Sequence, residues 1–183
     1  YDIEHITSKN ITEFKDYHGV RLSIPVSMDT IAQVLTMDIG FGDIVTPAPI
    51  ELDYPALLGH LPAAKILAYS LETVVAEKMH AVIDLADQNS RMKDYYDLYQ
   101  ILNTQELDTE VLQEAITKTF ENRHTRYDPD TIFFREDFGA NQIMGTRWKM
   151  FLKKITAKQS ILFSEVVAYL QKRILPYWNN LNH

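Results

Sequence analysis

Two patterns of apolar residues divide the chain. Up to about residue 45, β-branched and aromatic residues are frequent and alternate in places with polar ones, which is typical of β-strands. We expect strands over 1–11, 17–28 and 31–41, with a turn at 27–30 between the last two. This part of the chain therefore predicts a β-sheet.

Prolines punctuate the segment that follows. The spacing of Pro47, Pro49, Pro55 and Pro62 predicts irregular structure, because proline cannot donate a backbone hydrogen bond. An apolar stretch at 64–69 then predicts a short strand that returns to the edge of the sheet.

From Ser70 onward the apolar residues recur with a helical period. Ser70 and Asp108 are typical N-cap residues, and Pro176 predicts the end of the last helix. Helices are expected over 71–87, 91–103, 108–122, 139–156 and 161–175. The predicted fold class is α+β, with a sheet part at 1–69 and a helical bundle at 70–183.

Composition excludes several classes of protein. The 183 residues include no cysteine, which excludes disulfides and thiolate metal sites. No apolar run is long enough to span a membrane and no signal-peptide pattern opens the chain, so we expect a cytoplasmic protein with no membrane association.

The net charge of −7 is unevenly distributed. Residues 1–117 carry 7 Lys and Arg against 19 Asp and Glu, whereas residues 118–183 carry 11 against 6. The acidic part suits carboxylate chemistry with a metal ion. The basic part either approaches a phosphate backbone or consists of solvated helix faces, and the charge count favours the second interpretation.

Lys78 is the least expected residue of the first predicted helix. On a helical wheel it falls in the middle of the apolar stripe, whereas Glu77 falls outside it. A lysine there must extend to the edge of the core, pair with a carboxylate, or face a polar cleft. The functional interpretation is an ammonium group that contacts a nucleotide phosphate, and the wheel leaves these alternatives open.

The next predicted helix carries Asp94 and Asp97 on one flank, close enough to act on the same ligand. Paired carboxylates there could hold Mg²⁺ or orient a base or ribose. Alternatively, Asp94 pairs with Arg91 and Asp97 with Lys93 on a solvated surface. The spacing alone favours this local pairing.

Asp38 lies in an otherwise apolar strand, beside Gly40 and on the face opposite Met37 and Ile39. An aspartate in such a strand is costly unless it is satisfied or used. In phosphoryl-transfer sheets, strand carboxylates collect the metal ions that bridge the phosphates. The alternative is an aspartate on a solvent-facing surface of the sheet, and both possibilities stay open.

The six histidines show no metal-ligand spacing. His80 falls on the side of its helix away from the apolar stripe, so we expect it to be exposed. The chain has no P-loop, Rossmann glycine pattern, nucleophile elbow or zinc-protease motif, which excludes the enzyme classes that those motifs define.

Three stretches of the chain together resemble the AbiEii/AbiGii-type family of nucleotidyltransferase toxins, within the DNA-polymerase-β-like superfamily. They run from Met37 to Asp43, from Leu67 to Ala81 and from Ser90 to Leu98. Each is modest alone, but their order and spacing across 17–103 are fairly specific. The helices beyond about residue 110 match only in general character.

The resemblance implies a partial nucleotidyltransferase-type mixed β-sheet followed by a C-terminal helical bundle. It also implies metal-dependent transfer of a nucleotide from a nucleoside triphosphate (NTP), with Mg²⁺, to an RNA such as tRNA or to a protein acceptor. Such toxins belong to toxin–antitoxin or abortive-infection systems, so a cognate antitoxin is an expected partner.

The roles of four residues follow from the resemblance by position. Asp38 matches the aspartate of the second motif and is the expected metal ligand. Lys78 matches the third-motif lysine, which is expected to contact the phosphates, while Asp94 and Asp97 match the fourth-motif aspartates, expected to serve catalysis. The expected nucleotide-binding residues are Lys78, Arg91, Lys93 and Asp97.

The first motif of the family, a Gly-Ser turn followed by paired acidic residues, is missing. Gly-Ser occurs nowhere in the chain, and the motif would lie ahead of the segment 1–11. We therefore expect that the chain begins after this motif and that these 183 residues alone are inactive or nearly so. The alternatives are a degenerate relative that binds a nucleotide or a partner without catalysis and, on weaker grounds, a metal-dependent nuclease.

Overall fold

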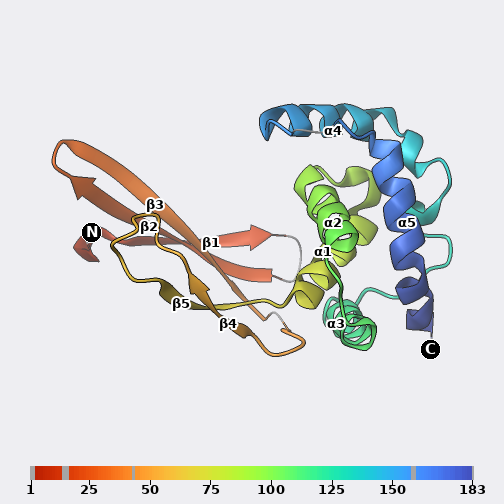
Figure 1. Cartoon of the computed structure of the whole chain (residues 1–183), viewed down its shortest axis with the longest axis horizontal. Coiled ribbons are helices and arrows are strands. Elements are labelled where there is room, and N and C mark those ends of the chain that lie inside the picture. Colours follow the sequence, from red (N-terminus) through yellow and green to blue (C-terminus); the bar gives the residue numbers. More distant parts are fainter. Residues whose placement is uncertain (1–2, 14–16, 43, 158–159, 183) are drawn as a thin grey trace. The chain divides into compact units, whose positions relative to one another are not determined.

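The structure is a computed structural model that describes residues 3–13, 17–42, 44–157 and 160–182. It contains two compact units, Tyr1–Ile44 and Val45–His183. Unit 1 holds the first three strands, and unit 2 holds a β-hairpin and all five α-helices (Figure 1).

Unit 1 is an antiparallel sheet in the order β1-β2-β3. Its strands are β1 (Thr7–Glu13), β2 (Tyr17–Met28) and β3 (Ile31–Phe41). The turn between β2 and β3 is Asp29-Thr30, and Asp29 has a φ of 54°. Aspartate tolerates this left-handed conformation better than most residues do. The resulting register places Arg21 opposite Asp38.

The strands predicted at 17–28 and 31–41 are therefore confirmed, together with their turn. The strand predicted over 1–11 is wrong at its start, because Ile3–His5 forms a 3-10 turn. Pairing with β2 begins only at Thr7, opposite Ser23, and continues to Glu13. Residues 1–2 of the predicted strand lie outside the described residues.

Unit 2 begins with a two-stranded antiparallel sheet of β4 (Ile50–Tyr54) and β5 (Ala64–Ala68). β5 confirms the short strand that the sequence predicts. Irregular structure across the whole proline segment is wrong, because Pro49 and Pro55 flank β4 and leave its N–H groups intact. The expected return to the edge of the first sheet is also wrong, since β5 pairs with β4 in a sheet of its own.

The five predicted helices are all present. They are α1 (Leu71–Leu85), α2 (Met92–Thr104), α3 (Thr109–Asn122), α4 (Gln142–Lys154) and α5 (Phe163–Asn179). Ser70 caps α1 by accepting a hydrogen bond from the Thr73 N–H at 3.2 Å, and Asp108 caps α3 by accepting from two backbone N–H groups. Both predicted caps are confirmed.

The prediction that Pro176 ends the last helix is wrong, because α5 continues to Asn179. A proline inside a helix removes one hydrogen bond and crowds the preceding turn. Trp178 lies in the turn that follows and is only 2% exposed, and its indole packs against Phe120 and Tyr127. Burial of this large side chain holds the final turn in helical conformation.

The apolar core of the described residues lies in unit 2. α1 packs against α2 and α3, and α2 also packs against α5. The largest buried side chains include Tyr95, Phe120, Phe133, Trp148 and Trp178. This core fixes the facing surfaces of α1 and α2, from which the candidate site is built.

The α+β class is confirmed, since antiparallel sheets precede five helices. The expected mixed sheet is not found in the described parts of the chain, because the connections between paired strands are too short for a parallel crossover. The division into a sheet part at 1–69 and a bundle at 70–183 stays a prediction. Among the residues described, no helix is long and apolar enough to cross a membrane.

Candidate functional site

The start of α1 is fixed by hydrogen bonds of small polar residues. The Thr73 N–H donates a hydrogen bond to the Ser70 hydroxyl oxygen, and the Thr73 hydroxyl donates to the Thr46 carbonyl oxygen at 2.6 Å. All three residues are buried. Lys78 lies two turns further along the helix, so its backbone position follows from a helix start whose polar groups are hydrogen-bonded and buried.

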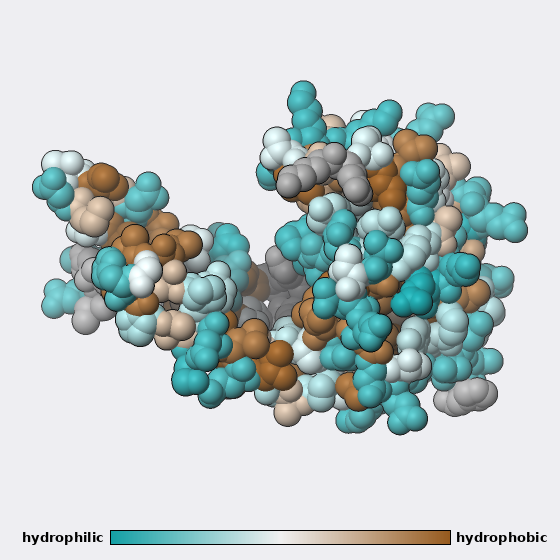
Figure 2. All heavy atoms as spheres, in the orientation of Figure 1, coloured by the Kyte–Doolittle hydropathy of each residue, from teal (hydrophilic) through white to brown (hydrophobic). Residues whose placement is uncertain are grey.

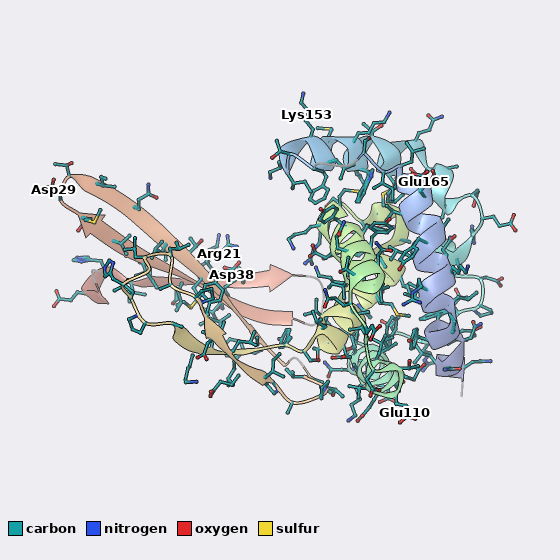
Figure 3. The ribbon with its side chains drawn as sticks, viewed as in Figure 1. Arg21, Asp29, Asp38, Glu110, Lys153 and Glu165 are labelled. Atoms are coloured by element: carbon teal, nitrogen blue, oxygen red, sulfur yellow. The ribbon has the colours of Figure 1, made fainter. Side chains whose placement is uncertain are left out.

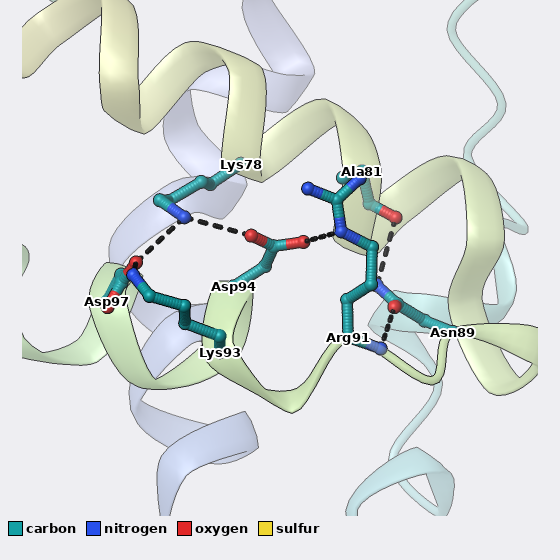
Figure 4. A network of polar contacts seen from close by, with 7 residues as sticks. All are labelled: Lys78, Ala81, Asn89, Arg91, Lys93, Asp94 and Asp97. Carbon is teal, nitrogen blue, oxygen red and sulfur yellow. Dashed lines mark hydrogen bonds and ion pairs between the residues drawn. The ribbon is translucent and has the colours of Figure 1, made fainter. Parts of the chain in front are cut away.

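Lys78 faces α2, where two carboxylates receive it (Figure 4). Its Nζ atom lies 2.9 Å from Asp94 Oδ1 and 2.8 Å from Asp97 Oδ2. The Lys78 side chain is 19% exposed, the Asp94 side chain 4% and the Asp97 side chain 21%. The ammonium group therefore sits at the edge of the core between two acids that are one helical turn apart.

Two further cations complete what we call the Lys78 cluster, defined as Lys78, Arg91, Lys93, Asp94 and Asp97. Arg91 Nε lies 3.1 Å from Asp94 Oδ2, and Lys93 forms an ion pair with Asp97. The side chains of both cations are mostly exposed. Asp94 Oδ2 is buried and, despite this ion pair, accepts no hydrogen bond of regular geometry. The cluster thus has a buried acidic side and an exposed cationic side.

A buried asparagine shapes the turn that leads into α2. Asn89 is fully buried, and its side chain donates to the Ala81 carbonyl oxygen at 3.2 Å and accepts from the Arg91 N–H at 2.7 Å (Figure 4). Its own carbonyl oxygen accepts from Arg147 on α4 at 3.2 Å. These contacts fix where α2 begins and therefore where Asp94 stands relative to α1.

The charges of the cluster stabilise one another. Burial opposes the charged form of Lys78, but its hydrogen bonds to Asp97 and Asp94 outweigh burial and raise the pKa of Lys78. Burial likewise opposes the charged form of Asp97, and the two lysines beside it lower the pKa of Asp97 overall. Lys78 is therefore a permanent cation and Asp97 a permanent anion around neutral pH.

The structure combines the alternatives that the sequence left open for these residues. Lys78 lies on a core-facing side of its helix and pairs with carboxylates. The local pairs Arg91–Asp94 and Lys93–Asp97 are present. They do not lie on a solvated surface, however, because Asp94 is buried and both acids also bind Lys78. A wheel drawn for one helix could not show this contact between two helices.

Asp38 lies in unit 1 and faces solvent. Its carboxylate pairs with Arg21 through both oxygens, each at 2.6 Å, and both side chains are 47% exposed (Figure 3). The hydrogen bond from Arg21 lowers the pKa of Asp38. The strand aspartate is thus satisfied by a cross-strand partner. Asp43, at the end of the same sequence motif, lies outside the described residues.

The described residues do not by themselves fit a magnesium site. Mg²⁺ is held by several oxygen ligands in octahedral geometry, with one or two carboxylates and often substrate phosphates among them. No group of three His, Cys, Asp or Glu side chains that could hold a metal is present in the described ranges. Asp38 also has a guanidinium group on both oxygens. Its role as a metal ligand stays a prediction.

His80 is buried, so the expected exposure is wrong. α3 covers the side of α1 that carries it, and the imidazole lies 2.7 Å from the Thr125 hydroxyl and packs edge-on against Phe120. Burial lowers the pKa of His80 to about 4. On the same side, Glu77 pairs with Arg123 at 2.5 Å. Sequence reasoning missed both contacts and the role of Asn89, because they depend on which helices pack together.

A lysine held between two acids, with exposed cations at the rim, can accept an anionic group such as a phosphate and hold it against α1 and α2. A comparison with curated proteins gave no match. A comparison with protein families matched residues 1–171 to the family described as "Nucleotidyl transferase AbiEii toxin, Type IV TA system". Because the match covers nearly the whole chain, this protein belongs to the AbiEii family of nucleotidyltransferase toxins.

Proposed function

We propose that this chain binds the triphosphate of an NTP at the Lys78 cluster and takes part in nucleotide transfer to an RNA acceptor such as tRNA. The family supplies the reaction class. The observation that carries the assignment of the site is the Lys78 ammonium group, held 2.9 Å and 2.8 Å from two acids on the neighbouring helix.

In nucleotidyl transfer, negative charge accumulates on the phosphate oxygens of the NTP. An acceptor oxygen bonds to the α-phosphorus, the bond from that phosphorus to the β-phosphate oxygen breaks, and pyrophosphate leaves. Positioned cations stabilise the charge that accumulates on the leaving group. Lys78 is suited to this role because its pKa is raised and its place is fixed. Arg91 and Lys93 offer further cations at the exposed rim.

Asp94 and Asp97 orient Lys78 in this proposal, and they also compete with the phosphates for it. An NTP must displace at least one carboxylate contact, which costs binding free energy. Mg²⁺ would bind chiefly through the NTP phosphates, and a role of Asp38 as a metal ligand remains a separate proposal. Since Asp38 is one carboxylate, we expect weak binding of Mg²⁺–NTP to these 183 residues. The cognate antitoxin, the abortive-infection role and a protein acceptor are further proposals that rest on the family.

Transfer of labelled nucleotide tests the role of Lys78. The protein expressed from its complete reading frame is incubated with Mg²⁺, labelled NTPs and total tRNA. Lys78→Ala should abolish labelling, and Lys93→Ala should reduce it. The control is Lys118→Ala, an exposed lysine on α3 paired with Glu114. Circular dichroism of each variant verifies folding, and undiminished labelling by folded Lys78→Ala would rule out the assignment.

A non-catalytic, partner- or nucleotide-binding protein is the second candidate function. It is favoured by the two ion pairs that already engage Lys78. It is also favoured because no cluster of three metal-ligating side chains occurs in the described ranges. Calorimetry with Mg²⁺ and each NTP distinguishes the two. Tight binding in calorimetry without transfer in the labelling assay supports the non-catalytic protein. Transfer that depends on Lys78 supports the enzyme.

A further inference from the structure

α4 is a strongly basic helix in an acidic protein. It carries Arg147, Lys149, Lys153 and Lys154 and contains no Asp or Glu, whereas the whole chain has a net charge of −7. Arg147 donates to backbone carbonyl oxygens, but the three lysines are exposed and have no ion-pair partner among the described residues. In Figure 3, Lys153 points away from the helix into solvent.

A cavity of about 800 Å³ lies between α4, with Thr156 and Ala157 after its end, and residues 160–164 at the start of α5. Lys149 and Lys153 line it, together with Thr146, Thr156 and Ser164. No Asp or Glu is among the described residues that line it. Cations and hydroxyl donors without a competing acid make this cavity suited to an anion.

Gly145 lies inside α4 and lines the same cavity. Glycine in the interior of a helix is destabilising relative to alanine. A Cβ atom at Gly145 would meet no heavy atom within 4 Å, so packing does not require glycine here. A position without a side chain does leave the helix backbone open to a closely approaching ligand.

Thr156, after the end of α4, is a non-glycine residue at a position that favours glycine. Its φ of 49° is in the left-handed region, which β-branched residues rarely adopt and where helix ends usually have glycine. Thr156 also lines the cavity. Alanine would therefore be more stabilising than glycine at position 145, and glycine would be more stabilising than threonine at position 156. Both departures fall at residues that line the cavity.

We propose that the cavity between α4 and the start of α5 binds the sugar–phosphate backbone of the acceptor RNA. Lys149 and Lys153 are one helical turn apart, about 6 Å along the axis, and Lys154 adds a third exposed cation at the end of α4. Such a group of cations suits a charged polymer. The choice of RNA rests on the proposed function. A membrane is disfavoured because the apolar side of α4, with Met144 and Trp148, is buried in the core.

The test is equilibrium binding of a fluorescein-labelled single-stranded RNA, and of bulk tRNA, to the full chain at several salt concentrations. Lys149→Ala/Lys153→Ala should raise the Kd about tenfold at low salt and reduce the slope of log K against log salt by about 1 to 2. Lys118→Ala/Lys172→Ala removes the same charge elsewhere and is the matched control. Gly145→Leu, which places a neutral side chain in the cavity, should also weaken binding.

The inference is overturned if the wild-type chain binds no RNA, or if Lys118→Ala/Lys172→Ala loses as much RNA affinity as Lys149→Ala/Lys153→Ala. It is also overturned if Lys149→Ala/Lys153→Ala weakens binding to phosphatidylserine vesicles but not to RNA. Lys78→Ala separates this inference from the proposed function. Loss of transfer with intact RNA binding supports both. If RNA binding depends on the α4 lysines but neither the wild-type protein nor any variant transfers nucleotide, the proposed function is rejected and this inference stands. If transfer occurs and Lys149→Ala/Lys153→Ala leaves the KM for RNA unchanged, this inference is rejected and the proposed function stands.

Discussion

The two units differ in how their apolar residues are used. In unit 2 the helices bury a contiguous core around α1. In unit 1, exposure is described at 4–11, 19–42 and 44, and no apolar side chain is buried there. Met37 and Phe41 on β3 are both more than half exposed. Apolar side chains accordingly reach the surface over the first sheet (Figure 2).

This difference separates two sources of stability. Unit 1 is held by backbone ladders and cross-strand pairs, which alone are marginal in water. Unit 2 has the buried apolar area that stabilises a domain. The helical unit should therefore fold cooperatively and resist local opening, while amides of the first sheet should exchange with solvent from a low-stability state.

The largest expected effect is the loss of a core aromatic residue from unit 2. Trp178→Ala removes a buried indole that packs against Phe120 and should lower the free energy of unfolding by about 3–5 kcal/mol. Urea denaturation followed by far-ultraviolet circular dichroism measures it. Phe41→Ala on the exposed face of β3 is the control, with an expected change below about 0.5 kcal/mol. Equal losses would show that unit 1 also packs a core.

His80 should make the stability of unit 2 depend on pH. Its pKa is lowered to about 4 in the folded state from 6.5 when unfolded, so the unfolded state binds more protons between these values. The stabilising effect is complete above about pH 6.5 and is lost as pH falls to about 4, on the order of 3 kcal/mol. Denaturation at several pH values measures this loss.

His80→Gln should flatten the stability profile between pH 6.5 and 4, whereas His60→Gln, at an exposed position, should leave it unchanged. A wild-type profile that is flat across this window would contradict the burial of a neutral imidazole.

The smallest effect compares one ion pair from each unit. Lys78→Ala leaves Asp94 buried with a single cation and should cost about 2 kcal/mol, less than a fully buried pair because Lys78 is partly exposed. Arg21→Ala breaks an exposed pair with Asp38 and should cost less than about 1 kcal/mol. Double-mutant cycles on both pairs give the coupling energies. A stronger coupling for Arg21–Asp38 would reverse the comparison.

The sequence predicted features that depend on neighbours along the chain. The helices, the caps Ser70 and Asp108, and the local pairs of α2 follow from period, side-chain chemistry and spacing. It also marked Lys78 as anomalous, because one wheel suffices to place a charge in an apolar stripe.

Features set by packing between distant segments were not predictable. The burial of His80 depends on α3, and the helical turn after Pro176 depends on the contacts of Trp178. The carboxylate partners of Lys78 lie on another helix, so no wheel of α1 contains them. The cross-strand partner of Asp38 became visible only with the register of β2 and β3.

Asn89 has a practical consequence for altering this protein. Its amide joins the end of α1 to the start of α2, and its carbonyl oxygen joins the same turn to α4. A residue inserted or deleted there would displace all three helices together. Tags, spectroscopic labels and new chain termini belong instead at the exposed Gln105 and Glu106, ahead of Leu107, which packs against the core, and of the α3 cap Asp108.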